Sequence, residues 1–223
     1  MTSSAQQIPL DLPHRPAHGR EDFLVGDANA DAIGWIDRWP AWPAPALIIH
    51  GAAASGKSHL AAVWAQKSGA QIVPAQEIVS IDAHTQTPLV IDGLDVWVGD
   101  RTIETAVFHL YNQLKENDRH MVITMRTPAS AIDFSVADLA SRLRAAPVAS
   151  IRPPDDDLLS SILIKLFHDR QIQVSTDVIR YIVPRMERSF RAARDITERA
   201  DHLALSRKSA VTVPLMRSVL AGL

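Results

Sequence analysis

The sequence predicts an α/β protein, in which a parallel five-stranded sheet flanked by helices is followed by an all-α C-terminal domain. Short apolar runs alternate with helical patterns over the first two thirds of the chain, as in sheets whose strands are joined by helices. After Pro153-Pro154 the strand pattern stops and only helical patterns remain. The 223 residues, 47% of them hydrophobic, suffice for one large domain or two small ones.

The expected strands are the apolar runs at 46–50, 71–74, 88–92, 120–125 and 148–153. Run 46–50 leads into a glycine-bearing loop and then a helical stretch that stops at Gly69. A second helical pattern covers 102–117. Strands that alternate with helices in this way form parallel sheets with both faces covered.

The C-terminal part contains helical patterns at 155–170, 176–188, 190–206 and 212–223. Asp155, Asp156 and Asp157 stand where acidic residues favour a helix start, and Pro184 is expected to break or kink its helix. Residues 1–20 contain three prolines and few bulky apolar side chains, which is typical of a flexible tail. The expected units are therefore a tail at 1–20, an α/β domain at 21–153 and a helical domain at 154–223.

Composition excludes several classes of function. The net charge of −2 and the pI of about 6.5 provide no positive field for holding a nucleic-acid backbone. The absence of cysteine excludes disulfides and thiolate-bound metals. No basic start leads into an apolar run, and no stretch reaches the about 18 apolar residues of a membrane span. We expect a cytoplasmic protein that is neither exported nor membrane-spanning.

Gly51 to Ser58 reads G-A-A-A-S-G-K-S and matches the phosphate-binding pattern G-x-x-x-x-G-K-S between a strand and a helix. Gly51 and Gly56 let backbone N–H groups face phosphate oxygens, Lys57 supplies a positive charge, and the Ser58 hydroxyl can ligate Mg²⁺. A glycine-bearing turn with a surface lysine is the alternative, which the strand–loop–helix context disfavours. The pattern predicts binding of ADP or ATP with Mg²⁺.

Asp92 ends an apolar run about 35 residues after this loop, and strand ends of parallel sheets border the ligand crevice. Asp92 is therefore the expected Mg²⁺ partner, although such an aspartate is elsewhere a common strand-ending turn residue. Many P-loop ATPases place a glutamate next to orient water, but this chain has Gly93, and Asp95 is the nearest carboxylate. Since loss of a general base costs about 10²–10⁴-fold in rate, we expect weak or no intrinsic hydrolysis.

With these motifs the sequence resembles the AAA+ ATPases of the DnaA type, and among them the Hda-type regulators that inactivate the initiator DnaA. The resemblance covers nearly the whole chain. It includes Phe23 to Asn29 ahead of the phosphate loop, the loop itself, Ile91-Asp92, the D-L-A-S-R-L box at 138–143, and the Pro153-Pro154-Asp155 passage into a helical lid domain.

The resemblance implies further site residues. Arg142 in the 138–143 box matches the arginine finger that acts in trans on a neighbour's nucleotide, although Arg126 and Arg144 could compete for this role. Arg191 matches the second-sensor arginine, with a solvated helix face as the alternative and Arg185, Arg188, Arg194 and Arg199 nearby. Arg126 departs from the short polar or acidic residues frequent at the first-sensor position. The residues implied to contact nucleotide are Leu24, Val25, Gly51, Ala54, Ser55, Gly56, Lys57, Ser58, His59 and Arg191.

Gln7, Leu10 and Leu12 are similar to the peptide with which bacterial proteins bind the sliding clamp of the replicase, a string that is weak by itself. An extended segment would present the glutamine for hydrogen bonding and the leucines as apolar anchors. DnaA continues beyond its lid into a DNA-reading domain, whereas this sequence ends at Leu223. The resemblance thus implies the clamp and DnaA as partners, and contact with DNA only indirectly.

Two classes of function remain open. In the first, the chain is a nucleotide-bound negative regulator of replication initiation at the nucleoid or replisome, which stimulates hydrolysis of ATP on DnaA. In the second, it is a stand-alone P-loop ATPase or a DnaA- or helicase-loader-like factor acting on DNA. The sequence leaves homo-oligomer formation open. Trp35, Trp39 and Trp42 are expected to pack a sheet edge or the adenine side of the pocket, with a base-stacking platform as the alternative.

Overall fold

The protein is described by a computed structural model that covers residues 24–82 and 84–222. Its sheet has five strands in the order β2-β3-β4-β1-β5, and the register of every pair is parallel, as the sequence predicts. The strands are β1 (Ala46–Gly51), β2 (Gln71–Pro74), β3 (Leu89–Asp92), β4 (Met121–Met125) and β5 (Val148–Ile151).

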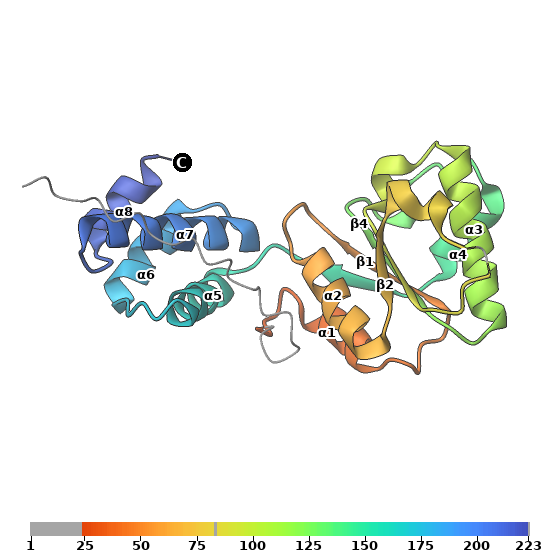
Figure 1. The fold of residues 1–223 in the computed structure, drawn as a ribbon, viewed down its shortest axis with the longest axis horizontal. Coiled ribbons are helices and arrows are strands. Elements are labelled where there is room, and N and C mark those ends of the chain that lie inside the picture. The colour runs from red at the N-terminus through yellow and green to blue at the C-terminus, as the bar shows by residue number, and fades with distance from the viewer. Residues whose placement is uncertain (1–23, 83, 223) are drawn as a thin grey trace, which may run out of the picture.

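Helices cover both faces of the sheet, and Figure 1 shows the sheet between them. α1 (Ala30–Asp37) and α2 (Lys57–Ser68) pack on one face against Leu47 and Ile49. α3 (Arg101–Glu116) and α4 (Ala137–Ala145) pack on the other against Ile48. Because alternate strand residues face opposite sides, these uninterrupted apolar strands supply two hydrophobic cores.

Within the described residues, short 3₁₀ helices connect the longer elements: η2 (Ala75–Ser80), η3 (Leu94–Trp97), η4 (Ala129–Ala131) and η5 (Val183–Arg185). η2, η3 and η4, together with α1, are not predicted by the sequence patterns. Each is at most eight residues long, and such short segments give too few turns for a helical period to stand out.

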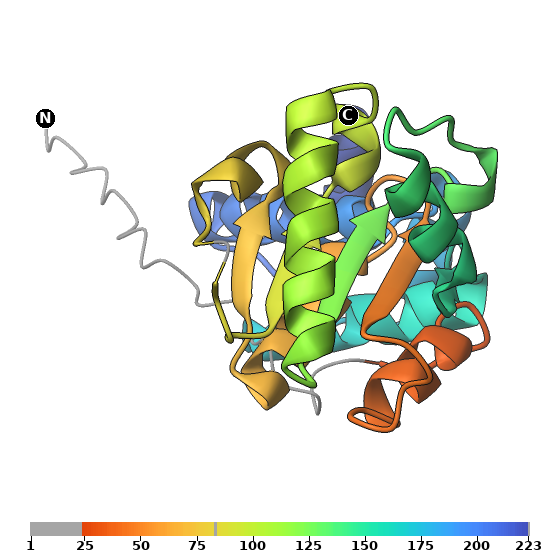
Figure 2. The same ribbon diagram turned by 90° about the vertical axis from the view of Figure 1, so that its right-hand side faces the viewer.

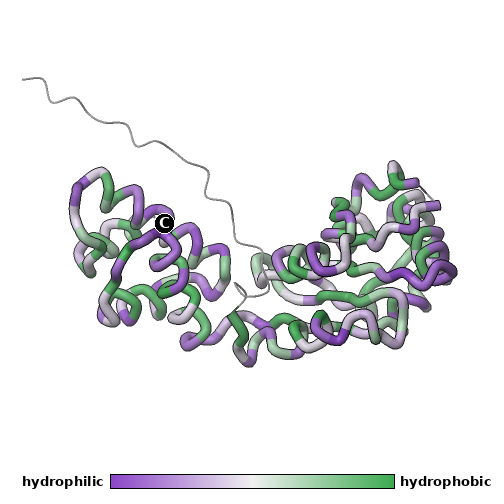
Figure 3. The backbone as a smooth tube through the Cα atoms, turned by 60° about the horizontal axis from the view of Figure 1, so that its bottom comes forward, coloured by the Kyte–Doolittle hydropathy of each residue, from purple (hydrophilic) through white to green (hydrophobic). Residues whose placement is uncertain are grey.

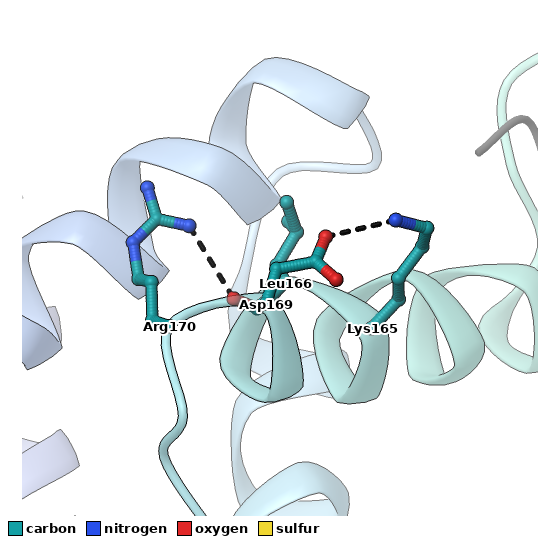
Figure 4. A network of polar contacts seen from close by, with 4 residues as sticks. All are labelled: Lys165, Leu166, Asp169 and Arg170. Atoms are coloured by element: carbon teal, nitrogen blue, oxygen red, sulfur yellow. Dashed lines mark hydrogen bonds and ion pairs between the residues drawn. The ribbon is translucent and has the colours of Figure 1, made fainter. Parts of the chain in front are cut away.

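The C-terminal part consists of α5 (Asp156–Asp169), α6 (Thr176–Ile182), α7 (Phe190–Arg207) and α8 (Val213–Leu220) around their own core. The Asp155 side chain accepts the Leu158 N–H at 2.8 Å, so the acidic run caps α5 as predicted. α6 ends before Pro184, which confirms the predicted break. At the other end of α5, Lys165 pairs with Asp169 at 2.8 Å, and Arg170 donates to the Leu166 carbonyl at 3.3 Å (Figure 4).

Residues 24–29 connect the two parts of the molecule. The buried Asn29 accepts the Gly26 N–H through Oδ1 and donates from Nδ2 to the Leu24 carbonyl, both at 2.9 Å. Ala28 belongs to the helical core, and its carbonyl accepts the Arg152 N–H at 2.8 Å. The segment ahead of α1 is thereby fixed to the strand-to-helix junction and to the C-terminal helices.

A tryptophan cluster lies at the amino ends of the strands. The rings of Trp42 and Trp64 stack at 5.5 Å, Trp39 meets Trp64 edge-on at 6.1 Å, and Trp42 Nε1 donates to the Trp35 carbonyl at 2.7 Å. These contacts confirm the predicted packing role.

No helix within the described residues is long and apolar enough to span a membrane, and Figure 3 shows hydrophobic and hydrophilic stretches mixed along the helices.

Candidate nucleotide-binding site

The phosphate loop joins β1 to α2 and has a backbone that requires glycine at two positions. A Cβ atom on Gly51 would lie 2.5 Å from the Ile151 carbonyl oxygen and 2.8 Å from Ser55 Oγ. Gly56, directly before α2, has φ +96°, which is strained for any residue with a side chain. The glycine positions of the sequence pattern therefore coincide with the positions that the fold requires. α2 starts at Lys57, so its first N–H groups face the loop.

Lys57 is 8% exposed, and its Nζ donates to the carbonyl oxygens of Gly51 at 2.8 Å and Ala52 at 2.6 Å. Burial lowers the pKa of Lys57, the positive charge of Arg126 lowers it further, and the carboxylates of Asp95 and Asp92 act in the opposite direction. The ammonium group is thus held among the loop's own carbonyls, with the positive charge of Arg126 nearby. An anionic ligand would place a negative charge beside both cations.

Ser58 and Asp92, predicted as Mg²⁺ partners, lie together. Ser58 Oγ is 3.0 Å and 3.1 Å from the two Asp92 oxygens. Thr124 Oγ1 donates to Asp92 Oδ1 at 2.5 Å and accepts the Gly93 N–H at 2.9 Å. A serine hydroxyl beside a carboxylate fits Mg²⁺, which prefers oxygen ligands and keeps several waters.

Asp95 is tied to the loop after β4, because its Oδ2 accepts the backbone N–H groups of Arg126 at 2.9 Å and Thr127 at 3.2 Å. Asp95 Oδ1 is buried and has no hydrogen-bond partner among the described residues. The side chain of Arg126 is exposed at the carboxyl end of β4, next to β1.

Sequence reasoning did not assign roles to Thr124 or to this use of Asp95. The partners of both lie about 31 residues away in the chain, so no local spacing reveals them. A usable signal for Thr124 is that it is the one polar residue within β4, all of whose residues are buried.

The C-terminal helices approach the phosphate loop at the start of α7. The Phe190 ring would lie 3.7 Å from a Cβ on Gly56, so it covers the last turn of the loop. The neighbouring Arg191 has a side chain 79% exposed, with Nε 3.6 Å from Asp195 Oδ2. The remaining predicted nucleotide contacts are Val25, 56% exposed, and the half-buried Leu24, Ala54 and His59, while Ser55 is buried.

Arg142 lies in α4, on the face of the sheet opposite α2 (Figure 1). Its guanidinium carbon is 5.0 Å from the Phe108 ring centre and 5.3 Å from that of Tyr111, and both rings belong to α3. Burial raises the pKa of Tyr111, and the charge of Arg142 opposes this shift. The structure therefore does not group Arg142 with the phosphate-loop residues. Gln7, Leu10 and Leu12 lie outside the described residues.

The sheet order, the phosphate loop after β1, the aspartate at the end of β3 and the C-terminal helical domain define the AAA+ fold. Domain III of the replication initiator DnaA from Thermotoga maritima has the same fold, with a TM-score of 0.82 and 18% identity over 95% of this chain and 98% of that one. AMPPCP-bound DnaA from Aquifex aeolicus matches with a TM-score of 0.70 and 18% identity over 82% and 65% of the two chains.

Residues 156–220 match the family model of the Hda lid domain. The DnaA protein of Thermomicrobium roseum is 26% identical over 92% of this chain and 51% of its own length, so the chain spans about half of this curated relative. The chain is therefore an Hda/DnaA-related AAA+ protein, with an Hda lid domain formed by α5 to α8.

Proposed function

We propose that this protein is a nucleotide-bound negative regulator of replication initiation, which stimulates hydrolysis of ATP held by DnaA. The match of residues 156–220 to the Hda lid domain carries this proposal, because it relates the chain to Hda-type regulators rather than to AAA+ proteins in general. We place its action in the cytoplasm at the replisome, with the sliding clamp as a tether through Gln7, Leu10 and Leu12.

The ligand that the site fits is ADP or ATP with Mg²⁺. Lys57 and the loop N–H groups would hold the phosphates, while Ser58 and Asp92 would hold the metal, which neutralises phosphate charge when bound. AMPPCP, a nucleoside triphosphate analogue, is bound in the related DnaA structure. Arg191 and the segment Leu24-Val25 would complete the site from the helical side and the adenine side.

Weak intrinsic hydrolysis is favoured over a stand-alone ATPase. Gly93 follows Asp92 where a water-orienting glutamate would stand, and it contributes no side chain. Asp95 does not replace that glutamate, because its Oδ2 holds two backbone N–H groups and its Oδ1 is buried. A general base must reach the proton that it abstracts. Nucleotide would therefore act in this protein as a structural ligand.

Arg142 would act on the nucleotide of DnaA. It lies on α4, across the sheet from α2, and its guanidinium is half-buried on two aromatic rings rather than extended into solvent. Arg144, one of the two competing residues, is engaged in its own chain, where its Nη2 donates to the Ile132 carbonyl at 2.9 Å. Arg126, the other competing residue, lies beside the phosphate loop of its own chain. The guanidinium group of Arg142 donates to no carbonyl among the described residues, and this difference favours Arg142 as the finger.

The decisive test measures hydrolysis of ATP prebound to DnaA, with the protein and with clamp loaded on DNA. Arg142→Ala should remove the stimulation, whose expected size is about 10³-fold or more for an arginine finger. Arg144→Ala should keep it, since Arg144 serves its own fold. Stimulation that survives Arg142→Ala would assign the role elsewhere. Rapid turnover by the protein alone, without DnaA, would favour the stand-alone ATPase.

A further inference from the structure

Glu104 of α3 is a fully buried carboxylate that the site described above does not use. Its exposed fraction is 0%, and no ion pair with it occurs among the residues that the structure describes. Its Oε1 accepts the Gly99 N–H at 2.8 Å, and its Oε2 accepts the Val136 N–H at 2.7 Å. A buried carboxylate without a cation is costly and persists where hydrogen bonds to it define a structure.

The two N–H groups belong to segments that are far apart in the sequence. Gly99 follows η3, which begins directly after Asp92 and Gly93 at the candidate Mg²⁺ site. Val136 is the N-cap residue of α4, the helix that carries Arg142. The Val136 side chain supplies no cap. Glu104 therefore joins the segment leaving the nucleotide site to the start of the arginine-bearing helix.

A second contact holds α4 further along the same side of α3. Glu104, Phe108 and Tyr111 follow one another at spacings of four and three residues, so they share one face of that helix. Glu104 binds the start of α4, and the two rings lie under Arg142 near its end. In Figure 2, α3 stands in front of the sheet, with the α4 region to its right.

The Glu104 hydrogen bond and the two aromatic rings position Arg142 in different ways. The rings hold the guanidinium group, and Leu139, Ala140 and Leu143 bury one face of α4 in the core, but ring and apolar contacts have little directionality. A carboxylate that accepts a specific N–H fixes the start of α4 in distance and direction. Without it, the Val136 N–H at the start of α4 would lose its acceptor.

We propose that Glu104 is a positioning residue for Arg142, which fixes α4 on α3 and on the Asp92 to Gly99 segment through its two backbone hydrogen bonds. The inference rests on the proposed action of Arg142 on DnaA. Glu104 would contribute to that action without touching either the nucleotide or the partner. The position of the Arg142 side chain would then depend on one buried carboxylate.

The test compares Glu104→Gln with Glu116→Gln, which changes an exposed carboxylate on the same helix. Glutamine keeps the size of Glu104, but its amide nitrogen cannot accept an N–H. Titrating each variant into clamp-loaded DnaA·ATP, we expect Glu104→Gln to lower the maximal rate about tenfold or more. The concentration for half-maximal stimulation and the affinity for ADP should stay within about twofold. Glu116→Gln should match the wild type.

A ¹H–¹⁵N spectrum gives a readout that does not depend on DnaA. In Glu104→Gln, the amide resonances of Gly99 and Val136 should shift and their hydrogen exchange should accelerate, while those of the phosphate loop stay in place. If Glu104→Gln does not fold, Glu104→Asp serves instead, since its carboxylate still accepts hydrogen bonds, while its side chain is one methylene shorter and moves both oxygens away from the Gly99 and Val136 N–H groups.

The outcomes separate this inference from the proposed function. A wild-type protein that fails to stimulate DnaA would overturn both. Stimulation that is lost in Arg142→Ala but unchanged in a folded Glu104→Gln protein would overturn only the role of Glu104. Parallel losses in maximal rate, half-saturation and ADP affinity would make Glu104 a general stability residue, which also overturns the proposal.

Discussion

Lys57 and Arg126 bring two positive charges to the carboxyl ends of β1 and β4. Arg126 follows Met125, whose register partner is His50 at the end of β1, so the arginine stands beside the phosphate loop. Its side chain has no ion pair among the described residues, although its charge influences Lys57. Like charges held together repel unless an anion lies between them, and the terminal phosphate of ATP would be that anion.

Replacement of Arg126 by alanine should therefore lower the affinity for ATP more than the affinity for ADP. We expect about tenfold lower affinity for Mg·ATP, the scale of one charge-assisted hydrogen bond, and a change within about twofold for Mg·ADP. Isothermal titration calorimetry with both nucleotides measures this. Arg119→Ala is the matched control, because Arg119 is exposed just ahead of the other end of β4. Equal losses for both nucleotides would place Arg126 elsewhere than at the terminal phosphate.

At this scale, sequence reasoning recovers residues whose role depends on neighbours in the chain. Gly51, Gly56 and Lys57 lie in one short string, and the fold requires both glycines. Glu104 was beyond reach, because within a helical pattern it resembles any solvated glutamate. Its two partners, Gly99 and Val136, come together only when α3 lies between them in the folded chain.

Among the elements, α7 makes the contact between the helical domain and the phosphate loop. Ser189 caps this helix by accepting the Ala192 N–H at 3.1 Å, which places Phe190 in its first turn over Gly56. The second-sensor candidate Arg191 is the next residue. The angle at which α7 starts therefore determines where Arg191 can reach.

Phe190→Ala should loosen that contact and leave the core of the helical domain folded. We expect about three- to tenfold weaker ADP binding, since the lost ring–loop contact amounts to some tens of Å² of apolar surface at about 25 cal/mol per Å². Calorimetry of ADP binding, with a thermal melt to verify folding, gives the comparison. Leu205→Ala tests an exposed apolar residue near the other end of the same helix and should bind as the wild type does. Unchanged ADP affinity in Phe190→Ala would mean that the helical domain contributes nothing through this ring.

The strands and the long helices were predictable because their periods extend over many residues. The sequence patterns give no prediction for η2, η3, η4 and α1, because these elements are short. The sequence also does not predict how these short elements pack. The position of η3, for example, is fixed by the hydrogen bond between Asp95 and the loop after β4. The sequence pattern thus predicts the elements that build the sheet, and the connections that shape the site depend on contacts across it.

At the scale of the whole molecule, the segment ahead of α1 belongs structurally to both parts. Leu24 and Ala28 pack with the helical core, while Arg152, between β5 and α5, donates to the carbonyls of Asp27 and Ala28. A clamp that held residues 7–12 would therefore be connected to the rest of the protein through a segment that borders the proposed adenine site.

The clamp contact itself is tested by replacing Gln7, Leu10 and Leu12 together with alanine. Co-elution with the sliding clamp on a sizing column should be lost, because the two apolar anchors and the hydrogen-bonding amide are removed. ADP affinity should persist within about twofold, since none of the three residues lies in the phosphate loop. Replacement of Gln6 by alanine is the control. Co-elution that survives the triple change would refute the proposed tether.

The tryptophans of the protein fall into two groups whose fluorescence would report on different regions. Trp35, Trp39, Trp42 and Trp64 gather at the amino ends of the strands, whereas Trp97 ends η3, five residues after Asp92, and is 37% exposed. Emission from the four clustered indoles forms a background remote from the carboxyl ends of the strands. The single indole of Trp97 stands on the segment that leaves the candidate metal site, so its fluorescence offers a label-free way to follow that segment in real time.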